Sequence, residues 1–172
     1  MKTRTLIAGG AIIASVAAAF FFKGGPAWRE EPGEGLVLSS QGTSHDGASG
    51  KLEIRCAGGK TEVRLYIPMH ALPPAGQSSG PPTLDLNEEF RDAKGNVLGG
   101  EGQAHEWVAA GQDYATRPDG DNFVSSLAGK ELLYLRGVAF AGEGLTSSLL
   151  IFPIRGLDSY RAKMSEACGK AS

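Results

Sequence analysis

The residues best placed to do chemistry in this chain are its two cysteines, Cys56 and Cys168. Two cysteines allow only one internal disulfide, and such bonds persist in oxidising compartments. Residues 51–68, KLEIRCAGGKTEVRLYIP, place Cys56 on the apolar side of an alternating segment. In residues 157–168, LDSYRAKMSEAC, apolar residues recur at helical spacing and put Cys168 on the apolar stripe. Both thiols should face the interior, so the sequence predicts a Cys56–Cys168 disulfide.

Other reactive residue types do not converge in the same way. Residues 44–46, Ser-His-Asp, have the types of a catalytic triad, but adjacent side chains in an extended loop point in different directions. We therefore interpret His45 as a solvated loop residue. The remaining histidines, His70 and His105, lie in separate segments without the short spacing of metal ligands.

Acidic and glycine-rich segments also lack the required patterns. Residues 119–122, DGDN, resemble the start of a calcium loop, but Phe123 breaks the motif, so a turn is expected. Glu88 and Glu89 are neighbours on a predicted strand and point to opposite sides, which favours a solvated edge over paired acid/base catalysts. Gly129 is followed by lysine without the frame of a phosphate-binding loop. The sequence thus predicts no catalytic, metal-binding or cofactor-binding residues and no enzyme.

The elements that would position these residues are mostly strands. Residues 51–68 form the clearest hairpin, and residues 132–140 and 145–154 form a second, whose continuous apolar runs suggest strands covered on both faces. We expect one antiparallel, sandwich-like β-domain with a C-terminal α-helix packed on it. Further expected segments are strands near 83–90 and 102–109, helical turns at 122–127, and loops at 39–50, 68–82 and 111–121.

The N-terminus has the pattern of an export signal. Lys2 and Arg4 precede an apolar run from Leu6 to Phe22, near the lower limit for spanning a bilayer. This run is either an inner-membrane anchor, with residues 5–22 in the bilayer, or a signal peptide that is cleaved. Both alternatives predict a periplasmic protein, anchored by its N-terminus or soluble after cleavage. The expected organisation is a leader at 1–23, a linker at 24–34 and one domain at 35–172.

Charge narrows the choice of partner. The chain has 17 basic and 19 acidic residues, and three of the basic ones (Lys2, Arg4 and Lys23) lie in the leader. The exported part therefore keeps 14 basic and 19 acidic residues, a net charge of −5. An acidic domain lacks the electrostatic signature of nucleic-acid binding, so we expect no nucleic-acid partner.

Several motifs together suggest a family likeness. They are L-x-I-R-C-x-x-G-x-T-E-x-x-x-x-I from Leu52 to Ile67, the apolar strand beginning at Leu132, and the segment from Phe152 that ends in Ala167-Cys168. This succession resembles the VasI/TagO-like periplasmic accessory proteins of type VI secretion. The C-terminal end also looks like the invasion-associated locus B family. The resemblance implies an exported β-rich fold with paired cysteines and supplies no catalytic residues.

The sequence therefore predicts a non-enzymatic cell-envelope protein. Its partner would be an envelope protein or a cell-wall component, bound through loops such as 68–82 and 111–121. Two alternatives stay open, a structural accessory subunit of a secretion assembly and a hydrolase whose site is not recognised.

Overall fold

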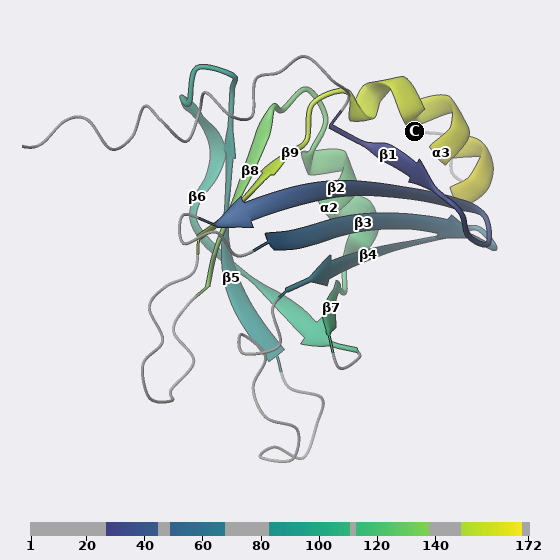
Figure 1. The fold of residues 1–172 in the computed structure, drawn as a ribbon, viewed down its shortest axis with the longest axis horizontal. Coiled ribbons are helices and arrows are strands. Elements are labelled where there is room, and N and C mark those ends of the chain that lie inside the picture. The colour runs from purple at the N-terminus through teal and green to yellow at the C-terminus, as the bar shows by residue number, and fades with distance from the viewer. Residues whose placement is uncertain (1–26, 45–48, 68–82, 111–112, 138–148, 170–172) are drawn as a thin grey trace, which may run out of the picture.

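The computed structural model describes residues 27–44, 49–67, 83–110, 113–137 and 149–169. The expected leader and the loop at 68–82 lie outside these ranges. No helix within them is long and apolar enough to cross a membrane. The elements shown in Figure 1 are β1 (Arg29–Glu31), β2 (Leu36–Ser44), β3 (Ser49–Ala57), β4 (Lys60–Tyr66), β5 (Thr83–Arg91), β6 (Val97–Ala109), β7 (Tyr114–Arg117), α2 (Gly120–Ser126), β8 (Leu132–Gly137), β9 (Leu149–Pro153), the 3-10 helix η2 (Leu157–Tyr160) and α3 (Arg161–Cys168).

The strands form one antiparallel sheet that closes on itself. Its order is β1-β2-β3-β4-β7-β6-β5-β8-β9, and the far end of β2 also pairs with β9. Thr43 lies opposite Ile151 and Ser44 opposite Leu150, so the eight strands from β2 to β9 make a barrel, with β1 added outside the ring. The predicted sandwich is therefore wrong, because a sandwich stacks two separate sheets. Alternation identifies strands, but it does not say which edges meet.

Two glycines permit this closure. Gly42 in β2 and Gly50 in β3 face each other across the strand pair, and Phe152 of β9 packs over both. A Cβ atom at Gly42 would lie 2.6 Å from the Phe152 ring, and one at Gly50 would lie 3.2 Å from it. The contact at Gly42 is closer than carbon atoms tolerate and the one at Gly50 is tight, so a larger residue at Gly42 would push β9 away from β2.

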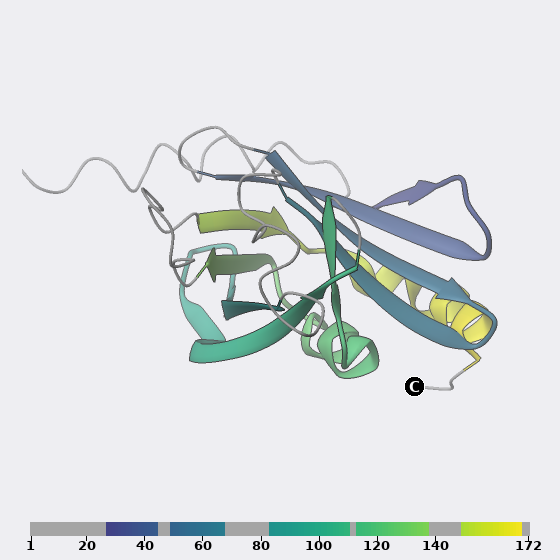
Figure 2. The ribbon, with the colours of Figure 1, turned by 90° about the horizontal axis from the view of Figure 1, so that it is seen from below.

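The barrel interior is filled by apolar side chains. Trp28 contributes from outside the ring: it is 1% exposed, and its Nε1–H donates to the Ile154 carbonyl at 2.9 Å. Trp28 and β1 fall within the segment expected to be a linker. Figure 2 shows both helices on the same side of the long β2–β3–β4 ribbon. Representative core residues from the barrel strands and helices are Leu38, Leu52, Val63, Leu86, Trp107, Ala115, Phe123, Leu133, Phe152 and Leu157.

A disulfide joins Cys56 of β3 to Cys168 of α3, as predicted. Both cysteines are buried, and they are 112 positions apart in the chain. Gly35 lies against this point with φ +73°, and a Cβ there would be 2.1 Å from the Cys56 carbonyl oxygen. The bond holds the C-terminal helix against the end of the first hairpin.

The clearest local patterns are confirmed. Residues 51–68 contain the β3–β4 hairpin, β8 pairs with β9, and residues 157–168 form η2 followed by α3. The second hairpin is not covered on both faces, because Tyr134 is only partly buried and Arg136 is exposed on the outer side of β8. Its expected loop falls in residues 138–148, outside the described ranges.

Two expected loops contain strands instead. β2 and β3 take up most of residues 39–50, and β7 lies within residues 111–121. Composition misleads here because Ser39 and Ser40 are polar yet each only 1% exposed. The Ser40 hydroxyl donates to the Pro153 carbonyl at 2.6 Å, so its polar group is satisfied inside the fold.

Replacing Cys168 with serine is expected to lower the free energy of unfolding by roughly 2–5 kcal/mol, because the bond restricts a long loop in the unfolded chain. Urea unfolding followed by tryptophan fluorescence measures this change. Replacing Cys56 and Cys168 together should cost about as much as replacing one, since either change opens the same bond. Two alkylatable thiols in the untreated protein, or equal stability with and without reductant, would contradict the assignment.

Candidate functional site

The residues singled out from the sequence are mostly dispersed. Of the three histidines, His105 is on β6, whereas His45 and His70 lie outside the described residues. Residues 119–122 lead into α2, and Asp119 occupies its N-cap position. Within the described ranges, no three His, Cys, Asp or Glu residues converge as a metal site.

Glu88 and Glu89 are the exception, and the expectation of a solvated edge is wrong. β5 is an interior strand between β6 and β8, and the two residues are only 2% and 7% exposed. They do point to opposite sides. Glu89 faces outward, where Arg91 and Arg136 compensate its charge. Glu88 faces the barrel interior.

An ion cluster surrounds Glu88 inside the barrel. The Trp107 Nε1–H donates to Glu88 Oε1 at 3.2 Å, and Arg117 Nε lies 3.3 Å from the same oxygen. Arg117 Nε is also 3.1 Å from Asp119 Oδ1, so one guanidinium is shared by two carboxylates. His105 Nε2 lies 3.8 Å from Glu88 Oε2. Three strands, β5, β6 and β7, thus bring their polar side chains together.

Burial governs how this cluster ionises. Desolvation raises the pKa of Glu88 to about 7, although Arg117 and the Trp107 indole oppose the rise. Burial and the nearby Arg117 lower the pKa of His105, so the imidazole is neutral at neutral pH. A carboxyl group that titrates near pH 7 can exchange a proton under physiological conditions. Glu88 is almost fully covered, so we expect its gain or loss of a proton to change the stability of the fold rather than to act on a bound substrate.

Arg117 also bridges a short join of the barrel. β7 pairs with β6 only at Val108 and Ala109, after which the strands separate. Beyond that point the Arg117 guanidinium donates to the Glu106 carbonyl at 3.2 Å, in place of a strand–strand hydrogen bond. Its ion pair with Glu88 anchors the same guanidinium to β5. We call this join between β6 and β7 the seam.

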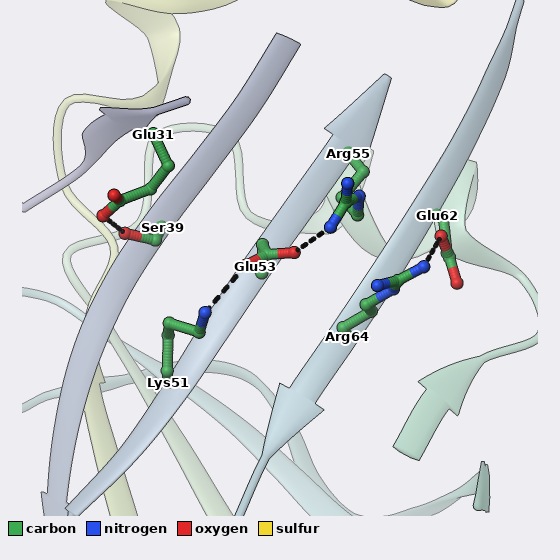
Figure 3. A network of polar contacts seen from close by, with 7 residues as sticks. All are labelled: Glu31, Ser39, Lys51, Glu53, Arg55, Glu62 and Arg64. Carbon is green, nitrogen blue, oxygen red and sulfur yellow. Dashed lines mark hydrogen bonds and ion pairs between the residues drawn. The ribbon is translucent and has the colours of Figure 1, made fainter. Parts of the chain in front are cut away.

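A second polar network covers the outer face of β2, β3 and β4 (Figure 3). Glu53 is 3% exposed and lies between Lys51 and Arg55, at 2.9 Å and 3.0 Å. Burial alone would raise the pKa of Glu53, but hydrogen bonds and charge from the two cations hold it below its usual value. On β4, Arg64 pairs with Glu62 at 2.8 Å.

Two tyrosines stand beside this network. Tyr66 of β4 pairs across the ladder with Tyr114 of β7, and their ring centroids are 5.3 Å apart. Lys51 Nζ lies 4.0 Å from the Tyr66 ring centroid, and the Arg64 guanidinium carbon lies 4.8 Å from that of Tyr114. Both rings are partly exposed on the outside of the barrel. We call the surface formed by these four residues the tyrosine face.

A hollow of about 400 Å³ adjoins the tyrosine face. Its lining comes from β2 and from β3, which contributes Lys51, and from Tyr66, Ile67 and Asp113. Ile67 is the last described residue before the predicted binding loop 68–82, and Asp113 lies within the predicted binding loop 111–121. The hollow therefore includes the described residues next to, or near the start of, the two segments predicted to bind a partner.

Comparison of the chain with protein-family models, curated proteins and solved structures finds no match. The resemblance to secretion accessory proteins stays a prediction. Sequence reasoning did not identify Arg117, which it placed in a loop, or the pairing of Tyr66 with Tyr114. Alternation does put Tyr66 on the polar side of its strand, and this was the available signal.

The raised pKa of Glu88 predicts a specific pH dependence. Between the unfolded-state value near 4.5 and the folded-state value near 7, the folded protein holds more protons than the unfolded one. The contribution of Glu88 to stability therefore falls as pH rises through this window, by at most roughly 3 kcal/mol. Replacing Glu88 with glutamine should remove this part of the dependence, measured by urea unfolding from pH 4.5 to 8.

A matched variant distinguishes the effect of Glu88 on the pH dependence of stability from the effects of other carboxylates. Glu89→Gln alters the neighbouring acid, which faces outward, and should retain the wild-type loss of stability between pH 4.5 and 7. Parallel pH profiles for the wild type and Glu88→Gln would contradict the assignment of the raised pKa to Glu88.

Proposed function

We propose that this protein is a non-enzymatic binding module of the cell envelope, located outside the cytoplasm, and that it engages an envelope protein or cell-wall component with the tyrosine face. The observation that carries the proposal is the pairing of Tyr66 with Tyr114 beside a hollow lined in part by Ile67 and Asp113. Tyrosine and arginine are enriched where proteins bind partners, because they combine large contact area with hydrogen-bonding groups.

The surroundings of the tyrosines favour recognition over catalysis. Lys51 and Arg64 lie over the rings and are held by Glu53 and Glu62, so both cations are already oriented. Oriented side chains lose less conformational freedom on binding, which favours affinity. The acid with a pKa near neutrality, Glu88, instead faces the interior and is covered.

Location outside the cytoplasm is supported by two independent features. The basic and then apolar N-terminal sequence has the pattern of an export signal. The disulfide suits an oxidising compartment, because cytosolic thiols are normally kept reduced. An accessory subunit of an envelope assembly would use the same surface, so the test below also applies to it.

The test is partner capture with and without the tyrosines. A protein carrying Tyr66→Ala and Tyr114→Ala is expected to recover at least tenfold less of the bound component than wild type, from cross-linked envelopes or purified cell wall. Tyr134→Ala is the matched control. Tyr134 also faces outward and has a cation over its ring, since the Arg91 guanidinium lies 4.5 Å from the ring centroid, but it stands on strand β8, away from the tyrosine face. Equal recovery by the double variant, or an equal loss in the control, would contradict the proposal.

A further inference from the structure

The seam leaves one edge of β6 without a strand beside it. In the part of the chain that the structure describes, residues 103–107 pair with β5 but not with β7. The Ala110 N–H donates to β7, and the Glu106 carbonyl points to the same side, where it meets Arg117. Because alternate residues of a strand turn their backbone groups to the same side, Ala104 also faces this edge.

The residues whose backbone groups turn to this edge lie at the surface. Ala104 and Glu106 are both exposed. Among the described residues, the Ala104 N–H and carbonyl and the Glu106 N–H have no hydrogen-bond partner. The His105 side chain shares its strand face with the fully buried Trp107, yet it is 32% exposed. The wall is therefore open to solvent beside β6.

The sequence of this edge does little to block pairing. Native sheets protect exposed edges with lysine, proline, bulges or very short strands. Residues 103–107, QAHEW, contain neither lysine nor proline. The irregular register of β6 is confined to the residues before Gln103. A regularly paired strand with free N–H and carbonyl groups on its other edge is a template for strand addition by an extended peptide.

Charge indicates which peptide would fit. Asp85 of β5 lies directly opposite Glu106 of β6, and both residues are exposed. Within the described ranges neither carboxylate has a cation partner, and like charges directly opposite each other destabilise a sheet. A basic side chain on an added strand would relieve this repulsion. A second copy of the chain would bring the same acidic edge and is disfavoured.

We propose that residues 103–107 of β6 accept an extended segment of a partner protein, rich in lysine or arginine, as an added strand. The added backbone bonds to the Ala104 N–H and carbonyl and to the Glu106 N–H, and one of its basic side chains lies beside Asp85 and Glu106. This site uses the backbone of β6 and is separate from the tyrosine face.

The test uses a defined probe, a blocked heptapeptide of alternating valine and lysine, added to the full chain in mild detergent. NMR should show slower amide exchange at Ala104 and Glu106, and the affinity should fall as salt is raised. The same peptide N-methylated at alternate backbone nitrogens should bind at least tenfold more weakly. A valine–glutamate peptide should not bind.

Variants test whether the acidic side chains beside this edge contribute to peptide affinity. Glu106→Lys should weaken binding of the valine–lysine peptide at least tenfold, whereas Glu166→Lys, at an exposed acid on α3, should leave it unchanged. Four outcomes would overturn the proposal. They are equal affinity of the N-methylated peptide, perturbations that map elsewhere, slow exchange of Ala104 and Glu106 in the free protein, and dimerisation through β6.

Discussion

The fold depends on the contact between β2 and β9, which turns a curved sheet into a barrel. At that contact Phe152 lies over Gly42 and Gly50, and a Cβ atom at Gly42 would clash with its ring. Once the ring is closed, the interior is small enough to be filled by side chains, as expected for eight strands. The disulfide then fixes α3 to the end of β3 opposite Leu36, which is the other end of the β2–β3 pair from the point of closure. Closure and cross-link therefore hold different parts of the domain.

The number of residue pairs between neighbouring strands varies around the ring, and a charged side chain lies where β6 and β7 separate. Most neighbouring strands share three or more residue pairs, but β6 and β7 share only two before they diverge, and β2 and β9 also share only two. Arg117 crosses the gap between β6 and β7 and is shared by Glu88 and Asp119, which accounts for ionisable groups beside the apolar core. The comparison with Glu53 is instructive. Both acids are almost fully covered, yet two cations lower the pKa of Glu53 while burial raises that of Glu88.

Elements with local signals could be predicted from the sequence. The first hairpin has strict alternation around Gly58-Gly59, and the final helix ends at Gly169, so both were placed correctly, as was the Cys56–Cys168 bond. The barrel could not be predicted, because the meeting of Thr43 with Ile151 joins residues more than a hundred positions apart and leaves no local pattern. A sandwich and a barrel present the same alternation.

The candidate sites were harder to predict for a related reason. β7 has four residues and lies in a polar segment, so neither Tyr114 nor Arg117 could be assigned to a strand. Without β7, Glu88 has no visible cation partner, and a pair of adjacent acids is most simply interpreted as solvated. The outward position of Tyr66 could be derived from alternation, but its neighbour across the sheet could not. The proposed binding surface depends on pairings that only the folded chain brings together.

The most direct test of a closed barrel with an open seam is residue-resolved hydrogen exchange. Leu150 and Ile151 are consecutive residues of β9 that lie between β8 and β2, so both amides should be protected. Along β6, the amides of His105 and Trp107 should exchange slowly, whereas that of Ala104 should exchange fast. Fast exchange at either Leu150 or Ile151, or uniform protection from Ala104 to Trp107, would contradict this account.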